Sequence, residues 1–292
     1  MEENWKVYIN GDIVSLKDAK ISVFDRGFQY GQGVFEGIRC YDGKIFKLEE
    51  HVLRLYDSAR AIHITIPLGR DGVKQAIKDT ARANGFQNAH IKPIVTRGTG
   101  WNLGFNPAED IKPNIVIMER PISGPLYGEQ SGGIRMAAVS IRKIPTSCFD
   151  PRIKSLNYLA NILARTEAHA SGADEALMLD IHGYVSEGTA DNIFLVRKKA
   201  LWAPPVQSAL EGITRQTVIA LARGDSIPTQ ETLLSMYDVY TADEVFVTGT
   251  GAGIVPVVEV DKRPIGNGKP GPITQQIIRM YAEEVKKGEP FQ

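Results

Sequence analysis

The sequence predicts an α+β fold made of two lobes. Runs with β-strand patterning and turn residues dominate both halves, and helical runs separate them too rarely for a parallel sheet with crossover helices. A segment rich in proline and glycine interrupts the apolar pattern near the middle of the 292 residues. We therefore expect a small α+β domain over 1–120, an interdomain linker over 121–133, and a large α+β domain over 134–292.

In the first half, short strands alternate with turns and then give way to two helices. Apolar residues three and four apart predict a helix over 47–62, and a second helix over 69–85 would end at Gly85. Asp42-Gly43 lies between two apolar-rich runs and is typical of a two-residue hairpin turn. Strands are expected at 5–11, 12–16, 33–41, 44–48, 89–98 and 114–120.

The second half repeats this mixture after the linker. A helix is expected directly after Lys154, another over 213–224 and a last one over 272–288. Strands are expected at 134–140, in a hairpin over 175–188, at 192–196 and at 244–250.

Composition argues against several classes of function. The 34 basic and 34 acidic side chains cancel, so no net positive field attracts nucleic acid or anionic lipid. The two cysteines, Cys40 and Cys148, lack CxxC spacing, and no zinc or calcium motif is present. The N-terminus has no signal-peptide pattern, and no apolar run reaches transmembrane length. We expect a cytoplasmic protein without a metal, nucleic acid or membrane partner.

Three local features could each bind part of a cofactor. Lys154 lies ahead of a helical run and offers an amine. Gly212 precedes Ile213 and Thr214 where a helix begins, and the first backbone N–H groups of a helix attract an anion. Residues 247–253, a strand that ends in Gly-Thr-Gly, offer a second anion-binding turn. Taken singly, these are equally a surface lysine, a helix cap and a turn.

An arginine and a carboxylate complete the set. Arg54 lies at the edge of the apolar stripe of the 47–62 helix and carries a guanidinium suited to a phosphate. Glu187 closes the predicted hairpin, where a buried acid could hold a heteroaromatic nitrogen protonated. Pyridoxal 5′-phosphate needs a lysine amine, an anion site and a charge partner for its ring nitrogen. Together the residues therefore indicate this cofactor.

With these residues the sequence resembles the fold-type IV pyridoxal-phosphate enzymes, and within them the branched-chain amino acid aminotransferases. Four stretches match in order: YGQGVFEGIRCY (30–41), HVLRL (51–55), KSLNYLANILARTEA (154–168) and YVSEGTADNIFLV (184–196). LEGITRQTV and VTGTGAGIVPV follow where the family has its phosphate-binding turns. The resemblance covers nearly the whole chain.

The resemblance implies two α+β domains with the cofactor at their interface, an obligate dimer, and a role for each matching residue. Lys154 would be the catalytic residue, bound to the cofactor as a Schiff base and shuttling the proton. The other cofactor-binding residues would be Arg54, Ile213, Thr214 and Thr250 at the phosphate, Glu187 at the ring nitrogen, Tyr158 at the ring hydroxyl and Leu210 against the ring. The substrate-binding residues would be Tyr30, Phe35, Gly37, His90, Lys92, Tyr127, Thr250 and Gly251.

The resemblance also implies the reaction, a ping-pong transfer of the amino group of L-leucine, L-isoleucine or L-valine to 2-oxoglutarate. Two departures keep alternatives open. Branched-chain enzymes usually carry Tyr-x-Arg where this chain has His90-Ile91-Lys92, and lysine lacks the guanidinium fork for a distal carboxylate. The four-residue step from Lys154 to Tyr158 is shared with D-amino acid aminotransferases and aminodeoxychorismate lyases. A D-amino acid or (R)-amine transaminase and a lyase are therefore the alternatives within the cofactor class, and a non-catalytic carrier of the cofactor is the alternative outside it.

Overall fold

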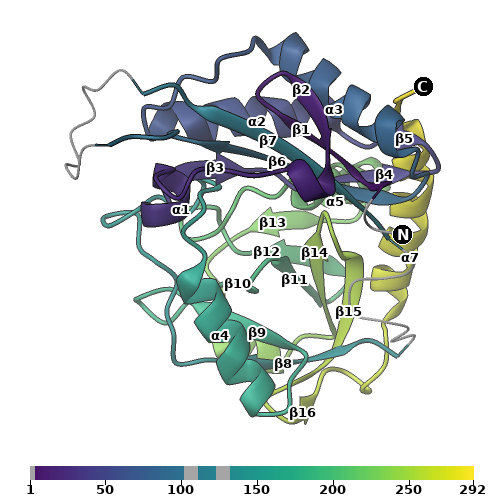
Figure 1. Ribbon diagram of the computed structural model, residues 1–292. Coiled ribbons are helices and arrows are strands. Elements are labelled where there is room, and N and C mark those ends of the chain that lie inside the picture. Colours follow the sequence, from purple (N-terminus) through teal and green to yellow (C-terminus); the bar gives the residue numbers. More distant parts are fainter. Residues whose placement is uncertain (1–3, 102–110, 123–131) are drawn as a thin grey trace. The chain divides into compact units, whose positions relative to one another are not determined.

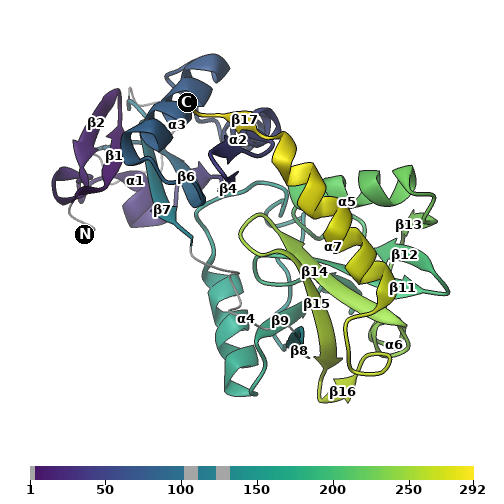
Figure 2. The ribbon, with the colours of Figure 1, turned by 90° about the vertical axis from the view of Figure 1, so that its right-hand side faces the viewer.

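The computed structural model describes residues 4–101, 111–122 and 132–292, so most of the predicted linker lies outside the described residues. The chain divides into two units, shown in Figures 1 and 2. The first unit comprises Met1–Ser123, Ile153–Asn157 and Lys286–Gln292; the second comprises Gly124–Arg152 and Tyr158–Val285.

The first unit is built on an eight-stranded antiparallel sheet (Figure 1). The strand order is β17-β5-β4-β6-β7-β1-β2, with β3 paired to β6 beyond the end of β4. The strands are β1 (Lys6–Ile9), β2 (Asp12–Ser15), β3 (Gly33–Phe35), β4 (Ile38–Tyr41), β5 (Lys44–Ile45), β6 (Ala89–Thr96), β7 (Asn114–Pro121) and β17 (Glu289–Pro290). The helices are α1 (Arg26–Tyr30), α2 (Leu48–Ala61) and α3 (Arg70–Asn84), with a 3₁₀ turn at Leu16–Asp18.

The core of this unit lies between the sheet and helices α2 and α3. Alternate residues of β7, such as Ile115 and Ile117, are buried, as a strand with one face in the core requires. They form one apolar cluster with Leu48 and Leu55 of α2 and Ile77 of α3. This packing fixes α2 against the sheet, and α2 carries the predicted phosphate arginine.

Two segments distant in sequence complete the first unit. The Phe35 N–H donates to the Lys154 carbonyl at 2.9 Å, and the Leu156 N–H donates to the Gly33 carbonyl at 3.0 Å, so 153–157 runs beside β3. The C-terminal strand β17 pairs with β5 in the same way. The contiguous division that we expected placed both segments in the domain over 134–292, and backbone pairing instead assigns them to the first unit.

The second unit is built on a nine-stranded mixed sheet in the order β10-β9-β8-β15-β14-β11-β12-β13, with β16 beside β15. Helices α5 and α7 pack on β14, while α4 packs on β8 and β9 (Figure 2). The strands are β8 (Ile134–Ala138), β9 (Glu175–Leu179), β10 (Val185–Glu187), β11 (Asn192–Arg197), β12 (Ala200–Ala203), β13 (Thr229–Glu231), β14 (Glu244–Gly249), β15 (Gly253–Val260) and β16 (Arg263–Pro264). The helices are α4 (Leu159–Ala170), α5 (Ile213–Gly224), α6 (Met236–Tyr240) and α7 (Pro272–Glu284), and a 3₁₀ turn at Val285–Lys287 follows α7.

The observed turns agree with the local predictions in the first unit. Asp42 and Gly43 both have positive φ (47° and 76°) and join β4 to β5, as the hairpin prediction requires. Gly85 caps α3 with φ 72°. The run expected as one strand over 33–41 is two strands, β3 and β4, separated by Glu36 and Gly37.

Candidate active site

Lys154 is held in place from two sides. Its N–H donates to the Ser58 hydroxyl of α2 at 3.1 Å, and its carbonyl accepts from the Phe35 N–H of β3. The half-buried side chain places its ammonium 4.8 Å from the centre of the Phe35 ring. Two elements of the core thus fix the backbone of the predicted catalytic lysine, while its amine lies on an aromatic face.

A second ammonium lies on the same ring. Lys92 Nζ is 4.7 Å from the Phe35 centroid, and burial together with the nearby charges of Lys154 and Arg120 lowers the pKa of Lys92. His90 and Lys92 lie two residues apart and so share one half-buried face of β6. Burial, together with the surrounding cations, lowers the pKa of His90 to about 4. Since the imidazole is neutral and the neighbours are cationic, this face favours an anionic group.

Gly37 lies against the same histidine. A Cβ atom at this position would lie 2.7 Å from His90 Nε2, so any larger residue would displace the imidazole. The predicted substrate residues Phe35, Gly37, His90 and Lys92 therefore meet Lys154 in one place within the first unit.

Arg54 belongs to a buried cluster with Glu36 and His51. Arg54 Nε donates to Glu36 Oε1 at 2.6 Å and Nη2 donates to Oε2 at 2.8 Å, a two-point contact, while His51 Nδ1 lies 2.8 Å from the same Oε2. Burial favours a higher pKa for Glu36, but the Arg54 guanidinium and His51 outweigh it and hold that pKa well below its usual range. The sequence predicted Arg54 but neither partner.

In the second unit, Glu187 ends β10 and is 5% exposed. Its Oε2 accepts from Asn192 Nδ2 at 3.0 Å and from the Leu210 N–H at 3.1 Å, and its Oε1 pairs with the ammonium of Lys143. Sequence reasoning missed Lys143 and Asn192. A buried carboxylate needs such partners, but neither residue lies at a spacing from Glu187 that would have identified it.

The first turn of α5 has the geometry of an anion site. Gly212 is its N-cap, and Ile213 and Thr214 follow in the first turn with side chains 7% and 3% exposed. The N–H groups of a first helical turn have no acceptor within the helix. A Cβ at Gly212 would lie 2.0 Å from Asn192 Oδ1, so this turn packs against the residue that supports Glu187.

The remaining predicted residues lie at the ends of elements. Tyr158 is the N-cap of α4, and Tyr30 is the last residue of α1. Thr250 and Gly251 form the half-buried turn between β14 and β15. Tyr127 lies outside the described residues, so the prediction for it stays a prediction.

These groups fit pyridoxal phosphate. The first unit supplies a lysine amine and an arginine fixed by a carboxylate, and the second supplies a buried carboxylate and a helix N-terminus. The roles assigned to individual residues stay predictions.

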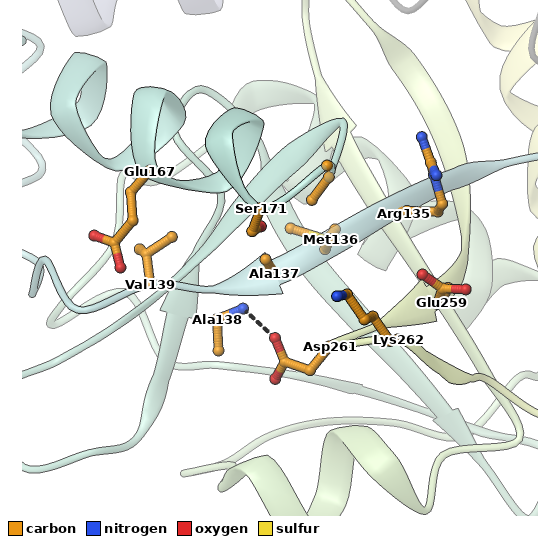
Figure 3. Close-up of a pocket in the computed structure, with 12 residues that line it drawn as sticks. Arg135, Met136, Ala137, Ala138, Val139, Glu167, Ser171, Glu259, Asp261 and Lys262 are labelled. Atoms are coloured by element: carbon orange, nitrogen blue, oxygen red, sulfur yellow. Dashed lines mark hydrogen bonds between the residues drawn. The ribbon is translucent and has the colours of Figure 1, made fainter.

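A cavity of about 460 Å³ in the second unit lies elsewhere (Figure 3). None of the predicted site residues lines it. Two of its acidic groups are already bonded: Asp261 accepts from the Ala138 N–H at 2.8 Å, as the dashed line shows, and Glu167 accepts from the Ser140 N–H at 2.7 Å. Among the described residues there is also no cluster of potential metal ligands, and no helix long and apolar enough to cross a membrane.

Three comparisons place these observations among known proteins. A family model described as amino-transferase class IV matches residues 33–260. A Methanocaldococcus jannaschii protein, provisionally named a branched-chain-amino-acid aminotransferase, is 50% identical over 279 residues, covering 95% of this chain and 96% of its own.

Two crystal structures of the "T.th." branched-chain amino acid aminotransferase superimpose closely. The complex with N-(5′-phosphopyridoxyl)-L-glutamate has a TM-score of 0.92, 36% identity and coverage of 99% and 97%. The complex with 4-methylvaleric acid has a TM-score of 0.91, 35% identity and the same coverage.

Proposed function

The chain belongs to the class IV aminotransferases, and we propose that it moves the amino group of L-branched-chain amino acids to 2-oxoglutarate in a ping-pong reaction. Membership confirms the predicted family, the α+β fold type and the pyridoxal-phosphate cofactor. The substrates are proposed because a similar enzyme was crystallised with 4-methylvaleric acid, which has the leucine carbon skeleton, and with a glutamate adduct of the cofactor.

When bound, pyridoxal phosphate withdraws electrons from the substrate Cα and so weakens its C–H bond. Lys154 holds the cofactor covalently between turnovers and moves the proton at the substrate Cα. The observation that carries this role is the fixed Lys154 backbone, held by Ser58 and Phe35, with its amine over the Phe35 ring. A base that must reach one carbon atom needs such a defined origin.

The other residues bind and orient. Arg54 and the first turn of α5, with Ile213 and Thr214, hold the phosphate together with Thr250. Glu187 holds the ring nitrogen protonated, because its carboxylate is already oriented by Asn192 and by the Leu210 N–H. Tyr158 bonds the ring hydroxyl and Leu210 packs on the ring.

Substrate recognition is divided by charge. The Thr250–Gly251 turn receives the α-carboxylate, and Phe35 and Gly37 line the aliphatic pocket. Lys92, beside the neutral His90, receives the distal carboxylate of 2-oxoglutarate in place of an arginine. A point charge without a fork makes fewer orientation-specific contacts with that carboxylate, so a high KM for 2-oxoglutarate is expected.

The test compares two lysine variants. Lys154→Ala should lose both the visible absorption of the cofactor-bound protein and turnover, whereas Lys92→Ala should keep the absorption. Half-reactions with L-leucine, D-alanine and (R)-phenylethylamine, followed by bleaching of that absorption, identify the donor. Wild-type turnover in Lys154→Ala would refute the mechanism. Bleaching by D-alanine or the (R)-amine but not by L-leucine would favour the alternative transaminases, and pyruvate release without an acceptor would favour a lyase.

We also propose that the protein is a homodimer and that Tyr30 reaches the site of the partner subunit. Several large apolar side chains near Tyr30 in sequence or structure are exposed: Phe28 is 69% and Trp101 is 78% exposed, and Phe24 and Trp101 are in ring contact at 4.5 Å. Clustered apolar exposure of this kind marks an association surface. Light scattering of the wild type and of Phe28→Asp tests this. A monomeric wild type would contradict the proposal, and Phe28→Asp should weaken a dimer that uses this surface. The cytoplasmic location stays a prediction.

A further inference from the structure

One face of α2 carries the proposed phosphate arginine, Arg54, and also contacts the backbone of the proposed catalytic lysine, Lys154. His51, Arg54 and Ser58 lie at helical spacing, three and four residues apart. The first two contact the carboxylate of Glu36, and the Ser58 hydroxyl accepts from the Lys154 N–H. Contacts within the first unit therefore determine where Arg54 lies relative to the backbone of Lys154.

Glu36 is the centre of this arrangement. Its side chain is fully buried, and it accepts the Nε and Nη2 edge of Arg54 in a two-point contact. Burial lowers the pKa of His51, although Glu36 opposes this, so a neutral imidazole donates its Nδ1–H to Glu36 Oε2. Because His51 also fixes the Glu36 carboxylate, the two-point contact holds the Arg54 guanidinium in one orientation.

The backbone around Glu36 extends this link to Lys154. The Glu36 N–H donates to the Pro93 carbonyl at 2.9 Å, and the preceding Phe35 binds the Lys154 carbonyl and lies under its ammonium. Glu36 thus positions Arg54 through its side chain, and the adjacent Phe35 positions Lys154 through its backbone N–H and its ring.

We propose that Glu36 is a positioning residue, which fixes the Arg54 guanidinium in the orientation that binds the cofactor phosphate and couples it to the strand that holds Lys154. The inference rests on the proposed role of Arg54. Glu36 itself contacts neither cofactor nor substrate in this proposal. Its removal should therefore weaken recognition of the phosphate and leave recognition of the ring unchanged.

The test titrates cofactor-free protein with pyridoxal phosphate and with pyridoxal, which lacks the phosphate, following visible absorption. In Glu36→Gln the amide group faces an N–H donor of Arg54 or His51, so the two-point contact is lost. The dissociation constant for pyridoxal phosphate should rise about tenfold or more, the equivalent of one charged hydrogen bond. That for pyridoxal should change less than about twofold. Glu36→Asp keeps the charge but is shorter, and should give an intermediate loss.

Two further variants separate positioning from general destabilisation. Glu244→Gln replaces a carboxylate that is also buried but accepts from Ile273 and Thr274 at the start of α7. It should leave the ratio of the two affinities unchanged. In an Arg54→Lys background, Glu36→Gln should add little further loss of phosphate affinity, since lysine offers no fork to orient.

An unchanged affinity ratio in folded Glu36→Gln, or equal weakening toward both aldehydes, overturns the inference. If Glu36→Gln does not fold, Glu36→Asp decides: an unchanged ratio there refutes positioning through Arg54. A wild type that fails to bind pyridoxal phosphate covalently contradicts the proposed function instead, so the two failures are distinguishable.

Discussion

Glu119 makes the stability of the first unit depend on pH. It lies on β7 in the row of core-facing residues that includes Ile115 and Ile117, and it is 2% exposed. Among the described residues, no hydrogen-bond partner lies within bonding distance of either carboxylate oxygen. Burial raises its pKa to about 7, although the nearby Asn84 side chain opposes this rise. The folded protein therefore holds this carboxyl protonated in conditions where an unfolded chain does not.

The direction and size of the effect follow from this pKa. In the unfolded chain the carboxyl ionises near its ordinary value of 4.5, so between pH 4.5 and about 7 unfolding releases a proton. Rising pH then favours the unfolded state by ~1.4 kcal/mol per unit. Folding stability should be highest with respect to this group below pH 4.5 and should be lower by about 3 kcal/mol above pH 7.

Glu119→Gln removes the titration and keeps the shape. Relative to the wild type, the free energy of unfolding of the variant should be similar at about pH 5 and greater by about 2–3 kcal/mol at about pH 8. Urea unfolding at several pH values measures this, with tryptophan fluorescence as one probe, because Trp5 packs against Phe86 in the first unit at 5.7 Å. Glu259→Gln, a half-buried strand glutamate of the second unit, is the control. A difference between Glu119→Gln and wild type that stays constant across this pH range would refute the reasoning.

Three other substitutions test the geometry of the two units. Lys92→Met should reduce kcat/KM for 2-oxoglutarate about tenfold or more, through loss of one charged contact, while the L-leucine half-reaction changes little; equal loss in both would contradict the assignment. Gly98→Ala should lower the unfolding free energy by roughly 2–4 kcal/mol in urea melts, since Gly98 has φ 98° and its Cβ would lie 2.0 Å from the Lys112 carbonyl oxygen. Gly212→Ala should weaken cofactor binding by displacing Asn192, and an unchanged dissociation constant in the folded variant would exclude that coupling.

Local patterns were sufficient to predict the long elements. The apolar spacing of 47–62 and 69–85 corresponds to α2 and α3, and the Asp-Gly and Gly85 signals correspond to the observed turn and cap. In these segments one buried face and one turn residue determine the structure, so a short window of sequence contains the information.

Other elements were missed because their turns use residues that rarely adopt positive φ. Lys198 and Lys199 have φ 49° and 63° and join β11 to β12, and Asp261 and Lys262 similarly join β15 to β16. A pair of lysines carries no turn signal in sequence. Strand β15 also contains Pro256 near its middle, which argues against a strand by pattern alone. Pairing with neighbouring strands stabilises these conformations.

The candidate site shows the same division. Sequence reasoning proposed Lys154, Arg54 and Glu187 because the cofactor needs an amine, a cation for its phosphate and an acid, but no pattern indicated that Glu36, Lys143 and Asn192 would contact Arg54 or Glu187. These partners come from other elements, and only the assembled sheet and helices bring them within bonding distance. Residue type can therefore suggest a cofactor, while the residues that orient its ligands require the structure.

The contrast between Glu36 and Glu119 shows why. Both are glutamates in strand-forming runs of the first unit, and their exposed fractions are 0% and 2%. Burial alone favours the neutral acid, and this is the outcome at Glu119, where no cation from the described part of the chain is bonded to the carboxylate. At Glu36, helix α2 supplies Arg54 and His51, and the pKa falls far below its usual range. The same residue type, also buried, is thus a group that stays neutral up to about pH 7 at one position and a fixed negative charge at the other, and the difference lies in whether a neighbouring helix presents an arginine to it.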